Sequence, residues 1–90
     1  KPLREKYFIS GEINTKVPSM EAAADRIEVL AREYRHGDVY RLDGVSVEFD
    51  DWHFNVRPSN TEPLLRLNLE GLTPEIMERR RDEVLGILRG

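Results

Sequence analysis

The sequence predicts a two-layer α+β sandwich, in which two helices cover one face of an antiparallel sheet and the other face stays polar. Three observations lead to this fold class. Apolar residues alternate with polar ones in five segments, two further stretches carry apolar residues at helical spacing, and short turns separate the four central strands. The predicted order is β-α-β-β-β-β-α.

The first strand is expected from Tyr7 to Val17, because apolar residues occupy odd positions there. Gly11 interrupts the alternation, which indicates a bulge. Ser19 is a candidate N-cap for the first helix, and Gly37 is a candidate C-terminal stop. The apolar face of this helix is predicted to consist of Met20, Ala23, Ala24, Ile27, Leu30, Ala31 and Tyr34.

A short strand is predicted at Val39–Leu42, followed by a tight turn at Asp43-Gly44, a pair that favours type I′ geometry. Another turn is expected at Asp50-Asp51. The inward-facing strand residues are predicted to be Val45, Val47, Phe49, Trp52, Phe54, Val56, Leu65, Leu67 and Leu69. Thr73 caps the last predicted helix, and Pro74 lies in its first turn. Its buried stripe is predicted to contain Ile76, Met77, Val84, Ile87 and Leu88.

The 90-residue chain contains no cysteine, and its 14 basic and 17 acidic residues give a net charge of −3. This length predicts one domain, at residues 7–90, with too little chain for a cleft between two lobes. Residues 1–6 are charged and are interpreted as the remnant of an interdomain linker. Because the chain begins at Lys1, we expect it to be a piece of a longer protein.

Composition also limits the partners and the location of the protein. The near balance of charges argues against a nucleic-acid-binding surface, and no apolar run is long enough for a membrane helix. The absence of cysteine fits a reducing compartment, so a cytoplasmic location is expected.

One polar segment joins two well-patterned strands: Arg57-Pro58-Ser59-Asn60-Thr61-Glu62-Pro63. Arg57 offers a planar donor fork that matches an oxyanion, and Ser59 and Thr61 offer hydroxyl donors. Asn60 tolerates the left-handed backbone that would turn successive N–H groups inward. The alternative is an ordinary turn, since these residue types are common in turns.

This segment resembles the phosphate-binding loop R-x-S-[G/N]-T-E-P of the α-D-phosphohexomutases. Glu12-Ile13-Asn14, Leu42-Asp43-Gly44-Val45 and the run from Trp52 through Glu70 also resemble the C-terminal domain of that family, in the same order. Asn60 stands where phosphoglucosamine mutases usually carry glycine. The resemblance therefore favours the phosphomannomutase/phosphoglucomutase branch.

The resemblance implies a parent isomerase of four domains that moves a phosphoryl group between two positions of a hexose phosphate through a hexose bisphosphate. It places a phosphoserine in the first domain, Mg²⁺ in the second and a sugar-reading loop in the third. The fourth domain, which this chain resembles, has a TATA-binding-protein-like fold, anchors the non-reacting phosphate and helps to close the cleft over substrate. Its partners are the hexose phosphate and the upstream domains of the same polypeptide.

Carried over by position, the implied phosphate-binding residues are Arg57, Ser59, Asn60 and Thr61. Pro58, Glu62 and Pro63 are expected to support the loop. No catalytic residue, metal ligand or cofactor is expected in this domain, and the isolated domain is expected to be inactive.

Structural roles are expected for the other polar residues. His36 and His53 lack metal-ligand spacing, and Asp50-Asp51 is read as a turn rather than a cation site. Arg79–Arg81 are surrounded by acidic residues, so a salt-bridged helix face is favoured over a nucleic-acid patch. Arg66 follows the polar segment closely, and either adds positive potential there or is simply exposed.

Two other functions remain open from the residues alone. A small α+β sandwich can present its open sheet to nucleic acid, and the polar segment can be a plain turn in a protein-interaction module.

Overall fold

The computed structural model describes residues 7–41 and 44–89. The expectations for the linker at 1–6, and for Leu42 and Asp43 at the third strand and its turn, lie outside these residues. The elements are β1 (Phe8–Ile9), β2 (Ile13–Lys16), α1 (Met20–Glu33), β3 (Asp38–Tyr40), β4 (Val45–Glu48), β5 (Trp52–Pro58), β6 (Leu64–Gly71) and α2 (Pro74–Arg89).

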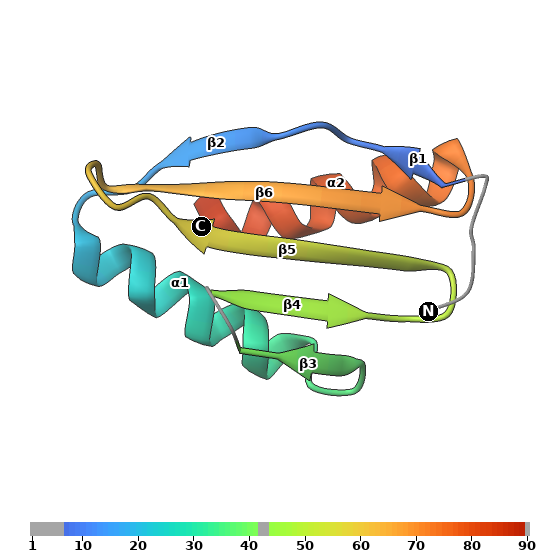
Figure 1. Ribbon diagram of the computed structural model, residues 1–90, viewed down its shortest axis with the longest axis horizontal. Helices are drawn as coiled ribbons and strands as arrows, with labels where there is room; N and C mark the ends of the chain where they lie inside the picture. Colours follow the sequence, from blue (N-terminus) through green and yellow to red (C-terminus); the bar gives the residue numbers. More distant parts are fainter. Residues whose placement is uncertain (1–6, 42–43, 90) are drawn as a thin grey trace.

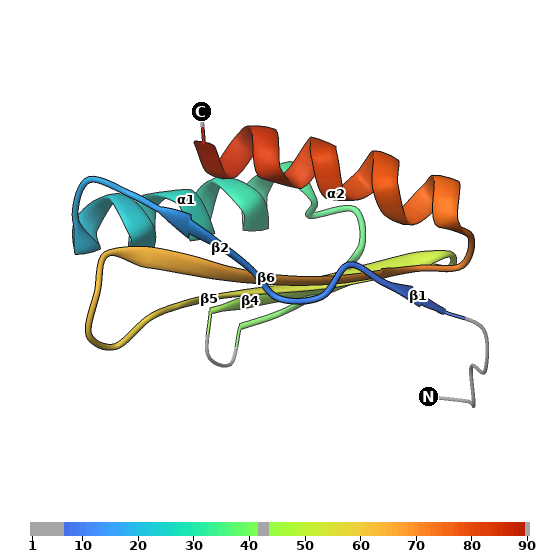
Figure 2. The same ribbon diagram turned by 90° about the horizontal axis from the view of Figure 1, so that it is seen from above.

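The strands form one antiparallel sheet in the order β1-β6-β5-β4-β3, and β2 also pairs with β6 (Figure 1). β1 and β2 are therefore two parts of one interrupted edge strand. Both helices lie on the same side of the sheet (Figure 2). The predicted order and the two-layer α+β class are confirmed.

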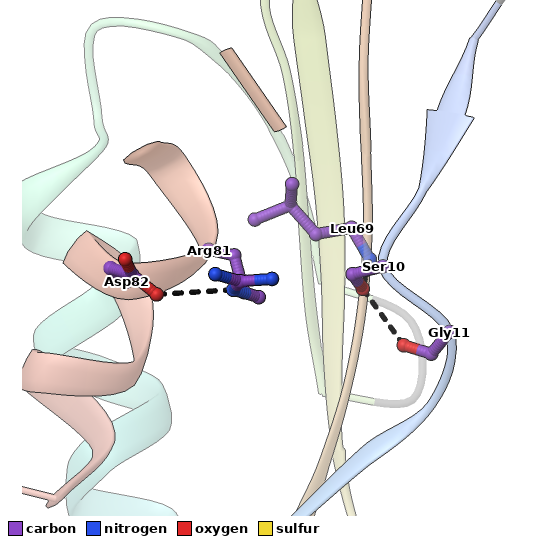
Figure 3. A network of polar contacts seen from close by, with 5 residues as sticks. All are labelled: Ser10, Gly11, Leu69, Arg81 and Asp82. Atoms are coloured by element: carbon purple, nitrogen blue, oxygen red, sulfur yellow. Dashed lines mark hydrogen bonds and ion pairs between the residues drawn. The ribbon is translucent and has the colours of Figure 1, made fainter. Parts of the chain in front are cut away.

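The interruption between β1 and β2 is a bulge at Gly11, as predicted. Ile9 pairs with Glu70 and Ile13 pairs with Leu67, so four steps along the edge strand match three along β6. Gly11 has a φ of 79°, in the left-handed region that favours glycine. The Ser10 hydroxyl donates to the Gly11 carbonyl oxygen at 2.8 Å and accepts from the Leu69 N–H at 3.2 Å (Figure 3).

The core lies between the sheet and the helices, and strand alternation predicts it well. Every inward strand position named above is buried, except Phe49, which is half-buried against the core. On α1, however, Met20 and Ala24 are exposed, so the predicted apolar face of this helix is too wide at its first turns. On α2, Leu85 is buried although the predicted stripe omitted it.

The helix starts are capped as predicted. The Ser19 hydroxyl accepts from the Ala22 N–H, and the Thr73 hydroxyl accepts from the Ile76 N–H, both at 3.1 Å. Asp50-Asp51 forms the two-residue turn between β4 and β5, closed by a 2.8 Å hydrogen bond from the Phe49 N–H to the Trp52 carbonyl.

Gly37, the predicted C-terminal stop, does not cap the first helix, because α1 ends at Glu33 with Tyr34 as its C-cap. Gly37 does not have a positive φ, so it is not a left-handed helix cap. Instead, a Cβ at this position would lie 2.7 Å from the Phe49 ring and 2.8 Å from Val47 Cγ1. A side chain is excluded there by packing against the sheet.

The arginine cluster of α2 is held by local carboxylates. Arg80 pairs with Glu83, and Arg81 pairs with Asp82, each at 3.0 Å (Figure 3 shows the second pair). Arg80 also lies 4.9 Å from the Trp52 ring centroid, a cation–π distance. The salt-bridged interpretation of this helix face is thus supported. Within the described residues, no helix is long and apolar enough to cross a membrane.

Candidate anion-binding site

The connection between β5 and β6, which contains most of the polar segment, lies at the end of the sheet where β2 leads into α1 (Figure 1). Its start is closed by a 3.0 Å hydrogen bond from the Ser59 N–H to the Leu64 carbonyl. Its end is tied to the edge strand, because the Val17 N–H donates to the Pro63 carbonyl at 2.9 Å. These two bonds hold the connection in one place relative to the sheet.

Arg57 and Pro58 do not belong to this connection. They are the last residues of β5, where they pair with Arg66 and Leu65 of β6. The connection itself contains only the residues from Ser59 to Pro63, a length that ordinary hairpins also have. The connection is therefore no longer than an ordinary hairpin loop, and Arg57 projects from the end of a paired strand.

Ser59 organises the turn. It is only 6% exposed, and its hydroxyl oxygen accepts from the N–H groups of Thr61 at 3.3 Å and Glu62 at 3.4 Å. Its own O–H hydrogen remains available to a ligand. The left-handed backbone predicted at Asn60 is wrong, since no non-glycine residue in the described part has a positive φ. The side-chain cap of Ser59 turns the chain instead, so no left-handed residue is needed.

Arg57 and Arg66 form the basic part of the site. They lie directly opposite each other on β5 and β6, on the sheet face that the helices do not cover. Two like charges in this position repel each other unless an anion lies between them. From the sequence alone, the role of Arg66 stays open between adding positive potential and simple exposure. The alternation of the strands carries a signal for it. Arg66 alternates with buried leucines, and Arg57 alternates with buried aromatic and valine residues, so both arginines are expected on the open face of the sheet.

These side chains meet at one surface hollow of about 560 Å³. Its lining residues are Arg57, Pro58, Ser59, Asn60, Thr61 and Arg66. All four residues predicted to contact phosphate are thus brought together, and Arg66 joins them. Glu62 and Pro63, predicted to support the loop, do not line the hollow. Guanidinium, hydroxyl and carboxamide donors in one concave surface can bind an oxyanion.

A second hollow of about 490 Å³ lies on the helix side of the same connection. Met20, Ala24 and Ile27 of α1 contribute its apolar wall, and it shares Pro58, Ser59 and Asn60 with the first hollow. The exposed residues at the start of α1 therefore border the loop rather than the core.

The histidines lie away from this site in structural roles. His53 Nε2 is 3.1 Å from Glu70 Oε1 on the open face, with the Tyr7 ring centroid 5.4 Å away. The His36 ring lies 5.1 Å from that of Phe49. Across residues 7–41 and 44–89, no three His, Asp or Glu side chains gather in a way that could hold a metal ion.

Fold and site together define a small α+β domain with a basic, hydroxyl-lined hollow at one end of its sheet. The family model for the phosphoglucomutase/phosphomannomutase C-terminal domain matches residues 12–87. The chain therefore belongs to this family and corresponds to its C-terminal domain.

Similar proteins agree with this membership. The chain is 42% identical over 87 residues to phosphohexose mutases of Xanthomonas campestris, and this alignment covers 96% of the chain and 19% of the relative. It is 47% identical over 81 residues to a phosphomannomutase of Salmonella montevideo, covering 88% of the chain and 17% of the relative. It is 40% identical over 77 residues to a probable phosphoglucosamine mutase of Pyrococcus horikoshii, covering 86% of the chain and 16% of the relative.

A solved structure shows the same fold. A phosphoglucomutase/phosphomannomutase family protein of Burkholderia thailandensis matches with a TM-score of 0.68 at 25% identity, covering 92% of this chain and 17% of that chain. The chain thus spans less than a fifth of these relatives. The family membership favours the first of the three predicted functions over the nucleic-acid and protein-interaction alternatives.

Proposed function

We propose that this domain binds the phosphate of a hexose phosphate or hexose bisphosphate within a phosphomannomutase/phosphoglucomutase. The observation that carries the proposal is the placement of Arg57 and Arg66 opposite each other beside Ser59, Asn60 and Thr61, all on one hollow. A phosphate dianion between the two guanidinium groups would replace their repulsion with attraction. The hydroxyl and carboxamide groups would donate to its remaining oxygens.

The chemical role we propose is anchoring. Such a site contributes binding and orientation, because its groups donate hydrogen bonds and none is paired with a base that would make it a nucleophile. We propose that phosphoryl transfer, and the Mg²⁺ that would stabilise the charge of the transferring group, belong to other domains of the parent protein. Closure of the cleft by movement of this domain is part of the same proposal. A cytoplasmic location stays a prediction that rests on the cysteine-free composition.

The direct test is a titration of the 90-residue chain with inorganic phosphate, followed by amide NMR. The expected result is millimolar binding, typical of a few hydrogen bonds, with the largest shifts at Arg57, at residues 59–61 and at Arg66. Sodium chloride at equal ionic strength is the control. Shifts centred elsewhere, or none at high phosphate, would contradict the proposal.

A second test uses the parent enzyme. Arg57→Ala removes binding that substrate and transition state share, so it is expected mainly to raise KM. If kcat and KM are both unchanged, the assigned role is wrong.

A further inference from the structure

The bulge at Gly11 determines which face of the sheet Glu12 lies on. If the pairing of β1 continued without an extra residue, residue 12 would lie opposite Leu67, whose side chain is buried under the helices. The extra residue shifts the register by one, and a one-residue shift moves a side chain to the other face of a sheet. Ser10 and the left-handed Gly11 hold the bulge in place (Figure 3).

As a result, Glu12 reaches the anion site. Its Oε2 lies 3.8 Å from Nη1 of Arg66, and both side chains are nearly half exposed. Arg66 lines the hollow and lies opposite Arg57. Among the ion pairs of the described residues, this is the contact that brings a carboxylate to either of these two arginines.

The distance indicates a loose contact. A charge-assisted hydrogen bond between guanidinium and carboxylate is about 2.7–2.9 Å long, so Glu12 offsets the charge of Arg66 without a tight hydrogen bond. A phosphate in the hollow needs the same guanidinium group, and its negative charge is repelled by the nearby carboxylate. The two anions therefore compete for Arg66.

We propose that Glu12 is a built-in competing anion, which offsets the charge of Arg66 when the phosphate site is empty and keeps the affinity for phosphate low. This inference rests on the proposed phosphate site. A low affinity for phosphate helps the product to leave. Tight binding of the phosphate in every state of the cycle would lower KM without raising kcat, and it would slow release of the product. Glu12 is a positioning residue in this account, since it acts through Arg66.

The test is Glu12→Gln, which keeps the shape of the side chain and removes its charge. We expect inorganic phosphate to bind about two- to fivefold more tightly, since a carboxylate several ångströms from a dianion in a solvated, salt-screened site has an effect of this order. The gain should shrink as sodium chloride is raised. Glu12→Asp, which draws the carboxylate back by one methylene, should give an intermediate affinity.

The matched control is Glu78→Gln on α2, an exposed carboxylate on the layer that covers the other face of the sheet. It makes the same change in net charge and is expected to leave phosphate binding within about 1.5-fold of wild type, because the charge is remote and screened. If Glu12→Gln binds phosphate equally or more weakly, or if Glu78→Gln has the same effect, the inference is overturned. Thermal unfolding checks that each variant is folded.

Arg57→Gln separates the two possible failures. If this variant binds phosphate as well as wild type does, the proposed phosphate site is wrong. If it loses phosphate binding while Glu12→Gln behaves as wild type, only the role of Glu12 is wrong.

Discussion

Arg57→Gln is expected to make the domain more stable and its phosphate binding weaker. Arg57 is exposed at the end of β5, opposite Arg66, and no hydrogen bond or ion pair holds its side chain in the described structure. Replacing it with glutamine removes the repulsion between the two guanidinium groups. A residue that costs stability in the empty protein is typical of a binding site.

The magnitudes follow from this arrangement. Like charges directly opposite each other in a sheet cost about 0.2–1 kcal/mol, so Arg57→Gln should gain about 0.5 kcal/mol, or about 2–4 °C in Tm for a domain of this size. The same change removes charge-assisted hydrogen bonds to phosphate, each of about 1.5–3 kcal/mol, which weakens binding roughly 10- to 100-fold. For a wild-type Kd of about 1 mM, 50 mM phosphate would stabilise wild type by about 2.3 kcal/mol and the variant by about 0.2–1.1 kcal/mol.

The assay is thermal unfolding with and without 50 mM phosphate, with sodium chloride matching the ionic strength. The order of stabilities should reverse: the variant melts higher without phosphate, and wild type melts higher with it. Arg79→Gln on α2, also exposed, controls for the change in net charge. A lower Tm for Arg57→Gln without phosphate, together with undiminished stabilisation by phosphate, would refute this reasoning.

Two further predictions concern stability alone, and urea or thermal unfolding checks both. Gly71→Ala should destabilise the domain by about 1–3 kcal/mol, because its Cβ would lie 2.7 Å from the backbone nitrogen of Met77 at the start of α2. Gly86→Ala, in open space on the same helix, should instead stabilise by about 1 kcal/mol, and equal effects of the two changes would contradict this. Burial, and then the 3.0 Å hydrogen bond to Glu83, raise the pKa of Tyr34 above its ordinary value of 10.0. The protonated phenol therefore stabilises the fold below pH 10, and this contribution is lost as the pH rises through the higher folded-state pKa. Tyr34→Phe should cost about 1 kcal/mol at pH 7 and flatten the alkaline loss of stability, and a variant curve as steep as that of wild type would exclude this assignment.

Much of the fold could be read from local patterns, because burial on one face of a strand or helix leaves a periodic signal. The alternation through Trp52, Phe54 and Val56 predicts a strand with one buried face, and the structure confirms it. Capping residues such as Ser19 and Thr73 report helix starts directly, because their hydroxyl groups bond to N–H groups only three residues away. The pattern failed at the start of α1, where Met20 is apolar but lies beyond the edge of the core.

The sequence by itself determined the fold class, the family and the donor-rich segment that ends with Pro63. It could not determine which residues face each other across strands, since pairing depends on register between distant segments. Only the tertiary structure decided that Arg57 lies in a strand opposite Arg66, and that Ser59 rather than a left-handed Asn60 turns the loop. Likewise, the one-residue bulge that brings Glu12 beside Arg66 acts through pairing with β6, a partner more than fifty residues away in the chain. The proposed anion site is a product of strand register, and register is a property of the assembled sheet.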